Sequence, residues 1–277
     1  MSSVKRQQAA TDTDAAEIDG SEIAGWSLSF TRRLAGILRP ILKWYFRSEV
    51  RGLDNFPPGK ALVVANHSGG FFALDIQIFG VHFYERLGYG RPMYTLSHDL
   101  IFTRINSWFL ARTGFIRATH DNALQALRNG AVVVTFPGGD YDAYRPTMRQ
   151  NVIDFGGRTG YVRAAIEAGA PIVPTVTIGL QETQLFLSRG TWLAERRGLK
   201  RRFRFEVFPI TFGFQFGFIP LNLPLPSKVI IQVLEPIDIV AKFGNDPDVA
   251  AVDAYVRSVM QTALDGLARQ RRWPILG

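Results

Sequence analysis

Hydrophobic residues along the chain fall into short β-branched runs, separated by stretches with helical spacing. Runs of this kind, bounded by Gly, Pro or Asn, are typical of strands in a covered sheet. The runs are Ala61–Ala65, Ala131–Phe136, Ile172–Ile178 and Val229–Leu234. Helical patterns occur at Asp75–Leu87, Asp121–Asn129, Arg158–Ala168 and Val249–Gln270. This alternation predicts an α/β fold with a mostly parallel central sheet covered by helices.

The segment Trp26–Arg47 has a different pattern, because it is both aromatic and basic. Apolar residues recur at helical spacing on one face, and arginines and a lysine recur on another. Pro40 should divide or kink this helix, since proline removes a backbone donor. A basic amphipathic helix with several aromatic residues suits the headgroup layer of an anionic membrane. Residues 25–50 are therefore predicted to be a pair of membrane-interface helices; packing of the apolar face on the domain is the alternative.

No stretch of the sequence has the unbroken run of about 18 apolar residues that a spanning helix requires. Val207–Ser227 is uncharged but contains four prolines, so it is predicted to be strand and loop, or an apolar surface that dips into lipid. We therefore expect a peripheral or monotopic membrane protein at the cytoplasmic face.

Composition and charge narrow the class of protein. The chain of 277 residues is 47% hydrophobic and 20% charged, as in globular proteins, and it has no cysteine, which excludes a disulfide scaffold and a thiol nucleophile. Residues 1–24 hold two basic and five acidic side chains and are predicted to be a disordered acidic tail. The net charge of +8 for the chain becomes +11 for residues 25–277, which favours an acidic partner.

Polar segments follow three of the predicted strands. They are Asn66–Gly70, Pro137–Asp140 and Gly179–Glu182. The carboxyl ends of parallel strands share one edge of a sheet, where ligands bind. If the three strands are parallel, these segments meet at one site.

His67 has the best setting for catalysis among the four histidines. It follows an apolar strand directly, lies beside glycines, and has Asp75 a few residues on. A neutral imidazole can take a proton from an alcohol, and a carboxylate on its second nitrogen fixes the tautomer. Motifs of other enzyme classes are absent, including G-x-S-x-G, the P-loop, G-x-G-x-x-G and the zinc motif H-E-x-x-H.

Three arginines stand near glycine-rich turns. Arg117 follows Gly114-Phe115-Ile116, and Arg145 and Arg149 follow the Pro-Gly-Gly turn. Guanidinium groups in such places can bind a phosphate through two hydrogen bonds. The alternative is that they are surface charges or partners of nearby aspartates.

Four segments taken together resemble the motifs of one enzyme family. NHSGGFFALD (Asn66–Asp75), GFIR (Gly114–Arg117), FPGG (Phe136–Gly139) and PIVP (Pro171–Pro174) occur in the order found in the glycerolipid and lysophospholipid acyltransferases. This is the family of the bacterial 1-acylglycerol-3-phosphate acyltransferases. The resemblance covers residues 26–240, including the basic amphipathic segment.

The resemblance implies a role for each matched residue. His67 would be the general base that activates the acceptor hydroxyl for direct attack on an acyl thioester, and Asp75 would orient it. Arg117 would bind the acceptor's phosphate, Gly138 and Gly139 would help to hold it, and Pro174 would shape the acyl-binding side. The family needs no metal or cofactor, and acyl-CoA or acyl carrier protein is the co-substrate.

Two departures from the family pattern matter. Seven residues separate His67 from Asp75 where the family has four, and on one continuous helix this spacing would hold them about 12 Å apart. The segment must therefore loop back. FPGG replaces the usual FPEG and removes a carboxylate expected near the acceptor, which makes a neutral acceptor plausible. Glu182, on the third converging segment, is the candidate replacement.

The sequence thus predicts a membrane-associated O-acyltransferase of phospholipid biosynthesis, with residues 51–277 as the acyltransferase domain. It would transfer a fatty acyl group from acyl-CoA or acyl carrier protein to a lysophospholipid such as 1-acylglycerol-3-phosphate. A neutral acceptor, monoacylglycerol or diacylglycerol, is the alternative, followed by a non-catalytic lipid-binding protein. No nucleic-acid partner is expected, because the cations lie among aromatics at amphipathic spacing rather than on a recognition module.

Overall fold

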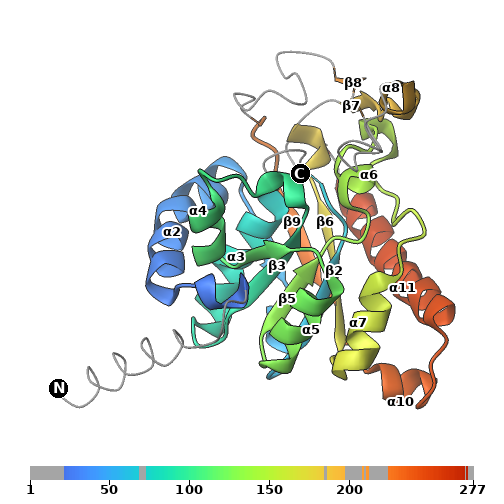
Figure 1. The fold of residues 1–277 in the computed structure, drawn as a ribbon. Coiled ribbons are helices and arrows are strands. Elements are labelled where there is room, and N and C mark those ends of the chain that lie inside the picture. The colour runs from blue at the N-terminus through green and yellow to red at the C-terminus, as the bar shows by residue number, and fades with distance from the viewer. Residues whose placement is uncertain are drawn as a thin grey trace.

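A seven-stranded sheet with the strand order β1-β9-β6-β2-β5-β3-β4 forms the centre of the structure (Figure 1). The computed structural model describes residues 22–68, 73–183, 186–196, 208, 210–211, 224–271 and 273. The strands of the sheet are β1 (Glu49–Arg51), β2 (Ala61–Ala65), β3 (Met93–Ser97), β4 (Phe115–Arg117), β5 (Val132–Thr135), β6 (Ile172–Ile178) and β9 (Ile230–Val233). A separate pair is formed by β7 (Phe186–Ser188) and β8 (Ile210–Thr211).

The middle of the sheet is parallel. Strand β2 pairs in parallel with β5 on one side and with β6 on the other, and β3 and β4 continue in the same sense. Strand β9 runs antiparallel to β6 and pairs in parallel with the short edge strand β1. The predicted α/β fold with a mostly parallel sheet is confirmed, and the strand predicted at Val229–Leu234 is one of the two that run the other way.

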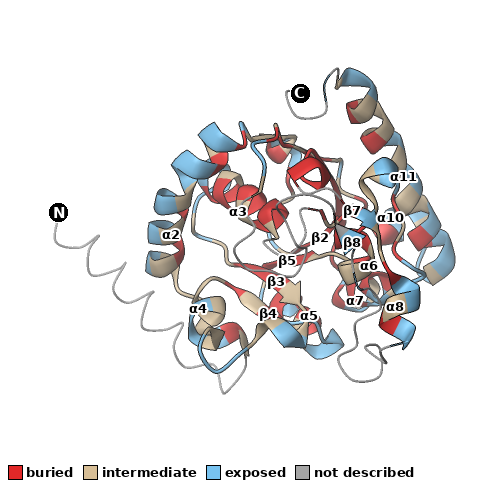
Figure 2. Cartoon of the chain, turned by 90° about the horizontal axis from the view of Figure 1, so that it is seen from above, coloured by how far each residue is buried: buried red, intermediate tan, exposed pale blue. Residues whose placement is uncertain are grey.

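Helices cover both faces of this sheet. The α-helices in the described part of the chain are α2 (Leu28–Pro40), α3 (Leu74–Leu87), α4 (Ser107–Arg112), α5 (His120–Arg128), α6 (Gly139–Ala143), α7 (Gly160–Ala168), α8 (Thr191–Arg196), α10 (Ile239–Phe243) and α11 (Val249–Gln270). Figure 2 shows buried residues concentrated in the strands and on the inner sides of the helices, with exposed residues on the outer sides of α2 and α11.

Strand β2 shows why the central runs are apolar without alternation. Its Leu62 and Val64 join the core that contains residues of α5, α7 and α11, while Ala61 and Val63 join the core beneath α3. All five residues of β2 are buried. A strand covered on both faces places every side chain in a core, so it reads as one hydrophobic run.

The predicted helices agree with the structure to within one or two residues. Helix α11 has the predicted bounds, α3 begins one residue earlier, and α7 begins at Gly160 instead of Arg158. Helix α5 begins at His120 and is capped by the Thr119 side chain, which accepts a hydrogen bond from the backbone N–H of Asn122. Asp121, the first residue of the predicted helix, therefore lies in the first turn of α5.

The amphipathic segment changes its helical form at Pro40, as its sequence suggests. Helix α2 ends at this residue, and the π-helical turn η2 (Ile41–Tyr45) follows directly. Proline cannot donate the hydrogen bond that would continue the α-helical ladder, and such interruptions are a common origin of π turns and kinks.

Ordered structure begins before residue 25, where the sequence interpretation ended the acidic tail. Residues 1–21 lie outside the described residues, but Glu22–Gly25 form the short 3-10 helix η1. Ile23 is buried in the core, and its carbonyl accepts a hydrogen bond of 2.9 Å from the hydroxyl of Tyr94. Residues 22–24 thus belong to the folded domain.

No helix in the described part of the chain is long and apolar enough to cross a membrane. Most of the apolar run Val207–Ser227 lies outside the described residues.

Candidate active site

Three loops meet at the carboxyl edge of the sheet. Strands β6, β2 and β5 are neighbours and all run in the same direction, so the segments that follow them leave the sheet side by side. The condition for the predicted convergence is met. The residues considered for catalysis on these loops therefore share one region, as expected for an open α/β sheet.

Asn66 fixes the direction in which the chain leaves β2. Its side-chain amide donates a hydrogen bond of 3.0 Å to the carbonyl of Thr177, and its Oδ1 accepts one of 2.8 Å from the N–H of the same residue. This buried side chain thus continues the pairing of β2 with β6 by one residue. His67 is held immediately beyond that junction.

Asp75 contacts the His67 ring despite their wide sequence separation. The distance from Nδ1 of His67 to Oδ2 of Asp75 is 2.6 Å. Helix α3 begins only at Leu74, after Ala73 in the left-handed conformation, so the two residues do not lie on one helix. The chain between them loops back, as the spacing required.

The Asp75 carboxylate is itself fixed by backbone donors. Oδ2 also accepts from the N–H of Ser68 at 2.9 Å, and Oδ1 accepts from the N–H of Ile76 at 2.8 Å. The side chain is buried, and it stands in the first turn of α3, where the helix dipole favours a negative charge. The partner of His67 is therefore a preorganised anion.

With Nδ1 directed to Asp75, the Nε2 atom of His67 is left to react. The side chain of His67 is 17% exposed, and no partner for Nε2 occurs among the described residues. The ring of Phe136 packs against the imidazole with a centroid distance of 4.5 Å. Burial by itself would lower the pKa of His67, but the charges of Asp75, Asp142 and Asp140 outweigh it and raise the pKa above its ordinary value of 6.5.

Asp142 is a site residue that the sequence interpretation missed. It lies on α6, and its Oδ2 accepts a hydrogen bond of 2.6 Å from the backbone N–H of His67. Burial raises the pKa of this carboxyl to about 6, although Arg145 and the His67 N–H act in the opposite direction. The signal that could have identified it is an acid four residues after the glycine that replaces the motif glutamate.

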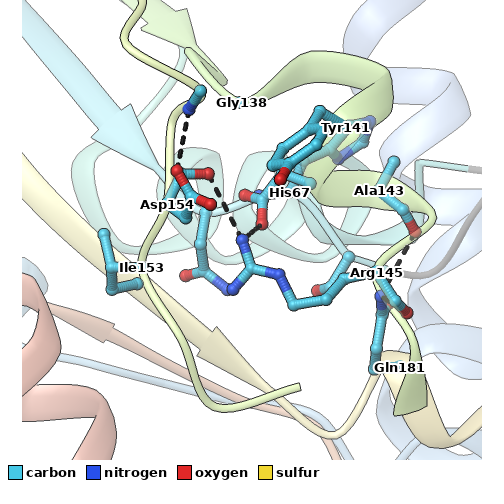
Figure 3. Close-up of polar contacts among 12 residues, drawn as sticks. His67, Gly138, Tyr141, Ala143, Arg145, Ile153, Asp154 and Gln181 are labelled. Atoms are coloured by element: carbon cyan, nitrogen blue, oxygen red, sulfur yellow. Dashed lines mark hydrogen bonds and ion pairs between the residues drawn. The ribbon is translucent and has the colours of Figure 1, made fainter. Parts of the chain in front are cut away.

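Arg145 is a buried structural cation in this structure, not an exposed phosphate ligand. Its guanidinium forms an ion pair with Asp142, and only 3% of either side chain is exposed. Figure 3 shows the Arg145 side chain beside Asp154, to whose backbone carbonyl the guanidinium donates at 3.3 Å. Arg149, in contrast, is exposed on the 3-10 turn η6 (Thr147–Arg149).

The two glycines after β5 allow Asp142 and Arg158 to pack closely against the backbone, so they do not form an open loop around a phosphate. A Cβ on Gly138 would overlap the Cβ of Asp142 and lie 3.0 Å from its Cγ, and one on Gly139 would lie 2.9 Å from Arg158. The Arg158 guanidinium donates to the Gly138 carbonyl at 2.7 Å. The Pro-Gly-Gly turn is thus packed against its own helix.

Arg117 lies at the same edge of the sheet but away from the histidine. It ends the edge strand β4, which is three strands from β2, or roughly 14 Å at the usual strand spacing. Its guanidinium contacts Glu22 and lies 3.9 Å from Asp99, while 46% of the side chain is exposed. Glu22, assigned above to the acidic tail, is therefore a partner of this arginine.

Glu182 does not replace the missing motif acid. It is buried in the 3-10 turn η7 (Gln181–Thr183) and forms an ion pair with Arg271, just beyond α11. The hydroxyl of Ser227 donates to it at 3.1 Å, and the amide of Gln150 at 3.2 Å. Burial raises the pKa of Glu182, against the effect of these donors. Its position serves to attach the end of α11 to the sheet edge.

Pro174 lies in the middle of β6 and is buried. It is opposite Val64 in the register with β2, and its carbonyl accepts from the N–H of Leu234 at 2.9 Å. It is therefore part of the sheet between the two cores. Any effect on the acyl-binding side would be indirect.

No group of three or more His, Asp or Glu residues in the described ranges is arranged to hold a metal ion. A hollow beside His67 is instead lined by polar groups from the three loops, among them Ser68, Asp142, Arg145 and Gln181. The site thus combines a general base, a carboxylate that orients it and a polar lining. These groups together can remove a proton from a hydroxyl group.

Comparison with known proteins agrees with this chemistry. The family model for acyltransferases matches residues 47–178. An uncharacterized protein of Mycobacterium tuberculosis is 33% identical over 249 residues, which cover 86% of this chain and 67% of that protein. The DGAT1/2-independent enzyme synthesizing storage lipids from Mus musculus is 27% identical over 198 residues, covering 67% of this chain and 55% of that enzyme.

A solved structure shares the fold. The 1-acyl-sn-glycerophosphate (LPA) acyltransferase PlsC from Thermotoga maritima has a TM-score of 0.55 and 18% sequence identity, and the match covers 95% of this chain and 89% of that chain. The chain therefore belongs to the acyltransferase family and is an acyltransferase.

Proposed function

We propose that this enzyme transfers a fatty acyl group from a thioester, acyl-CoA or acyl carrier protein, to the hydroxyl of a lipid acceptor. The observation that carries the proposal is the contact of 2.6 Å between His67 Nδ1 and a buried carboxylate at the carboxyl edge of the sheet. This contact holds the Nδ1–H tautomer and leaves the lone pair of Nε2 for the substrate.

His67 alone can carry the proton from the acceptor hydroxyl to the leaving thiolate. Nε2 takes the hydroxyl proton while the oxygen attacks the thioester carbonyl carbon. Collapse of the tetrahedral intermediate breaks the carbon–sulfur bond, and the imidazolium returns the proton to the leaving thiolate. Asp75 stabilises the imidazolium between these steps. The products are one ester and one thiol.

A neutral acylglycerol is the acceptor that the geometry supports best. Arg145 is closed off by its ion pair with Asp142, and Arg117 is held by Glu22 beside Asp99. Gly138 removes the acid of the usual motif, and the relative from Mus musculus is named for storage lipids. A neutral headgroup needs no arginine, so this arrangement of cations suits monoacylglycerol or diacylglycerol.

A lysophospholipid such as 1-acylglycerol-3-phosphate is the second candidate. The observation in its favour is that nearly half of the Arg117 side chain is exposed at the carboxyl edge, where a phosphate could displace Glu22. Guanidinium groups bind phosphate through paired, charge-assisted hydrogen bonds. In that case the product would be phosphatidic acid and the pathway phospholipid biosynthesis.

The substitution Arg117→Gln distinguishes a neutral acceptor from a phosphorylated one. If the acceptor is neutral, the KM for monoacylglycerol and for diacylglycerol should change by less than about twofold, because no charged contact is lost. If it carries a phosphate, KM for lysophosphatidate should rise by about 10- to 100-fold, the usual effect of losing a hydrogen bond to a charged group. Thiol release measured over this acceptor panel gives the answer, with Arg149→Gln as the exposed-arginine control.

We also propose that α2, η2 and α4 form the surface that contacts an anionic membrane. Ile37, Ile41 and Trp44 are 67%, 53% and 81% exposed, and Trp108 of α4 is 60% exposed. Phe30 of α2 contacts Trp108 edge to face at a centroid distance of 5.4 Å, so the two helices share one aromatic surface (Figure 1). Exposed apolar area flanked by arginines fits the headgroup layer, and α4 would extend the surface of the interface pair that the sequence predicts for residues 25–50.

The double substitution Ile41→Ser and Trp44→Ser should weaken binding to vesicles that contain phosphatidylglycerol by about tenfold or more, because burial of the two apolar side chains in lipid is lost. Sedimentation with vesicles measures the partition. Trp192→Ser is the matched control, since Trp192 is 58% exposed on α8, outside this surface. Equal losses in both variants would contradict the assignment of the surface.

A further inference from the structure

The carboxylate that the FPGG turn lacks is supplied in this chain by Asp142, four residues later. Gly138 stands where the related motif has glutamate, and a Cβ at position 138 would overlap the Cβ of Asp142. The two positions therefore compete for one space. A side chain at 138 excludes the present Asp142, and glycine at 138 admits it.

Asp142 contacts the loop that carries the base. Its Oδ2 accepts from the backbone N–H of His67 at 2.6 Å, while its other oxygen receives the Arg145 guanidinium. Both members of this ion pair are almost completely buried. Arg145 is in turn fixed by the Asp154 carbonyl, and its own carbonyl accepts from the Gln181 side chain at 2.9 Å. The pair thus joins the loops after β2, β5 and β6.

We infer that Asp142 is a positioning residue for the acyl transfer proposed above: it holds the His67 backbone and supplies a second negative charge behind the imidazolium. Glu182, the replacement expected from the sequence, lies elsewhere and pairs with Arg271. Asp142 thus places a carboxylate next to the His67 backbone although position 138 is glycine.

Other charges around the two groups define the electrostatic balance. Asp75 of α3 and Asp140 of α6 also act on His67, and the charges of Arg145 and Arg189 interact with Asp142. Arg158 pairs with Asp140 at 3.2 Å. Removal of the Asp142 charge leaves Asp75 in place, so it should lower the pKa of His67 without abolishing the His67–Asp75 contact.

The test is the titration of the His67 ring by NMR in wild type and in Asp142→Asn. Asn has one acceptor oxygen and no charge, and we expect the pKa of His67 to fall by about one unit, the lower end of the effect of a nearby opposite charge. His82, His98 and His120 are internal controls and should titrate as before. The acidic limb of the kcat/KM profile should move to lower pH by the same amount.

The same pKa of His67 in wild type and in Asp142→Asn would overturn the inference. This result does not depend on the substrate, because the titration requires no activity. Absence of acyl transfer by the wild type would instead contradict the proposed function and leave the titration result standing. A fall in activity with an unchanged pH profile would show a merely structural role for Asp142.

Moving the acid from position 142 to position 138 tests whether the two side chains compete for the same space. Gly138→Glu combined with Asp142→Gly removes the Cβ that would collide and returns an acid to the position found in FPEG. We expect the double variant to exceed the single variant Asp142→Gly in kcat by about tenfold, the scale of coupling between neighbouring residues. A double variant no more active than Asp142→Gly would contradict the exchange.

Discussion

Replacing His67 by Gln should lower kcat by about 10³-fold, within the range for loss of a general base. Glutamine cannot take up the proton of the acceptor hydroxyl, but it is similar in length and can still accept or donate hydrogen bonds beside Asp75. Thiol release at saturating donor and acceptor measures the effect. Thermal unfolding should show that the variant is folded.

His120→Gln is the control for this substitution. The His120 side chain is 46% exposed and pairs with Glu167 at 2.8 Å on the surface, and it does not line the hollow beside His67. Its loss should leave kcat within about twofold of wild type, since a surface ion pair has a small energetic effect. Activity of His67→Gln equal to that of His120→Gln would rule out His67 as the base.

Replacing Asp75 by Asn should lower kcat by about 10²- to 10³-fold, less than the roughly 10⁴-fold loss that the same change causes in a serine protease triad. The asparagine amide cannot both accept from His67 Nδ1–H and keep the charge that stabilises the imidazolium. Single-turnover kinetics with a labelled acyl thioester would measure the chemical step directly.

The same substitution should change the pH dependence in a defined direction. Asp75 is the strongest of the charges that raise the pKa of His67, so its neutralisation lowers that pKa. The base must be unprotonated to act, and the acidic limb of the rate profile therefore moves to lower pH. In the wild type, the raised pKa means that protonated His67 stabilises the fold below a pH of about 6.5, and this contribution is lost as the pH rises through the folded-state pKa. A profile unchanged in Asp75→Asn would contradict the dyad.

The central strands and the position of His67 could be predicted from sequence because a strand buried on both faces is a continuous apolar run, which is easy to recognise. All five residues of β2 are apolar, and the first polar residues after it, Asn66 and His67, mark the sheet edge. The contact with Asp75 also followed from chemistry, once a continuous helix was excluded by the spacing. Strands β1, β3 and β4 of the central sheet were missed; β1 and β4 have only three residues each, such as Glu-Val-Arg, which carry no periodicity.

The arginines show what the sequence does not determine. Arg145 and Arg117 both follow glycine-containing turns, yet one is buried against Asp142 and the other is half exposed at the edge of the sheet. The difference depends on which carboxylates the fold brings near: the partner of Arg145 is three positions away in the sequence, and that of Arg117 is 95 positions away. Charge type and local motif alone could not separate a structural cation from a candidate ligand.

Asp142 and Glu182 illustrate the same limit for acids. Both follow strands that end at the site, but the geometry of α6 turns Asp142 toward the His67 backbone, while Glu182 turns toward Arg271 at the end of α11. The overlap between a Cβ at 138 and Asp142 depends on coordinates and cannot be read from the sequence.

The most direct test of the central claim is the ratio of thiol released to ester formed by the wild-type enzyme, measured on one sample with acyl-CoA and monoacylglycerol in vesicles. Direct transfer by a His67 base predicts a ratio of about one and thiol release that depends on the acceptor, since no acyl-enzyme is formed. Thiol release that proceeds equally without acceptor, with free fatty acid as the product, would contradict the account.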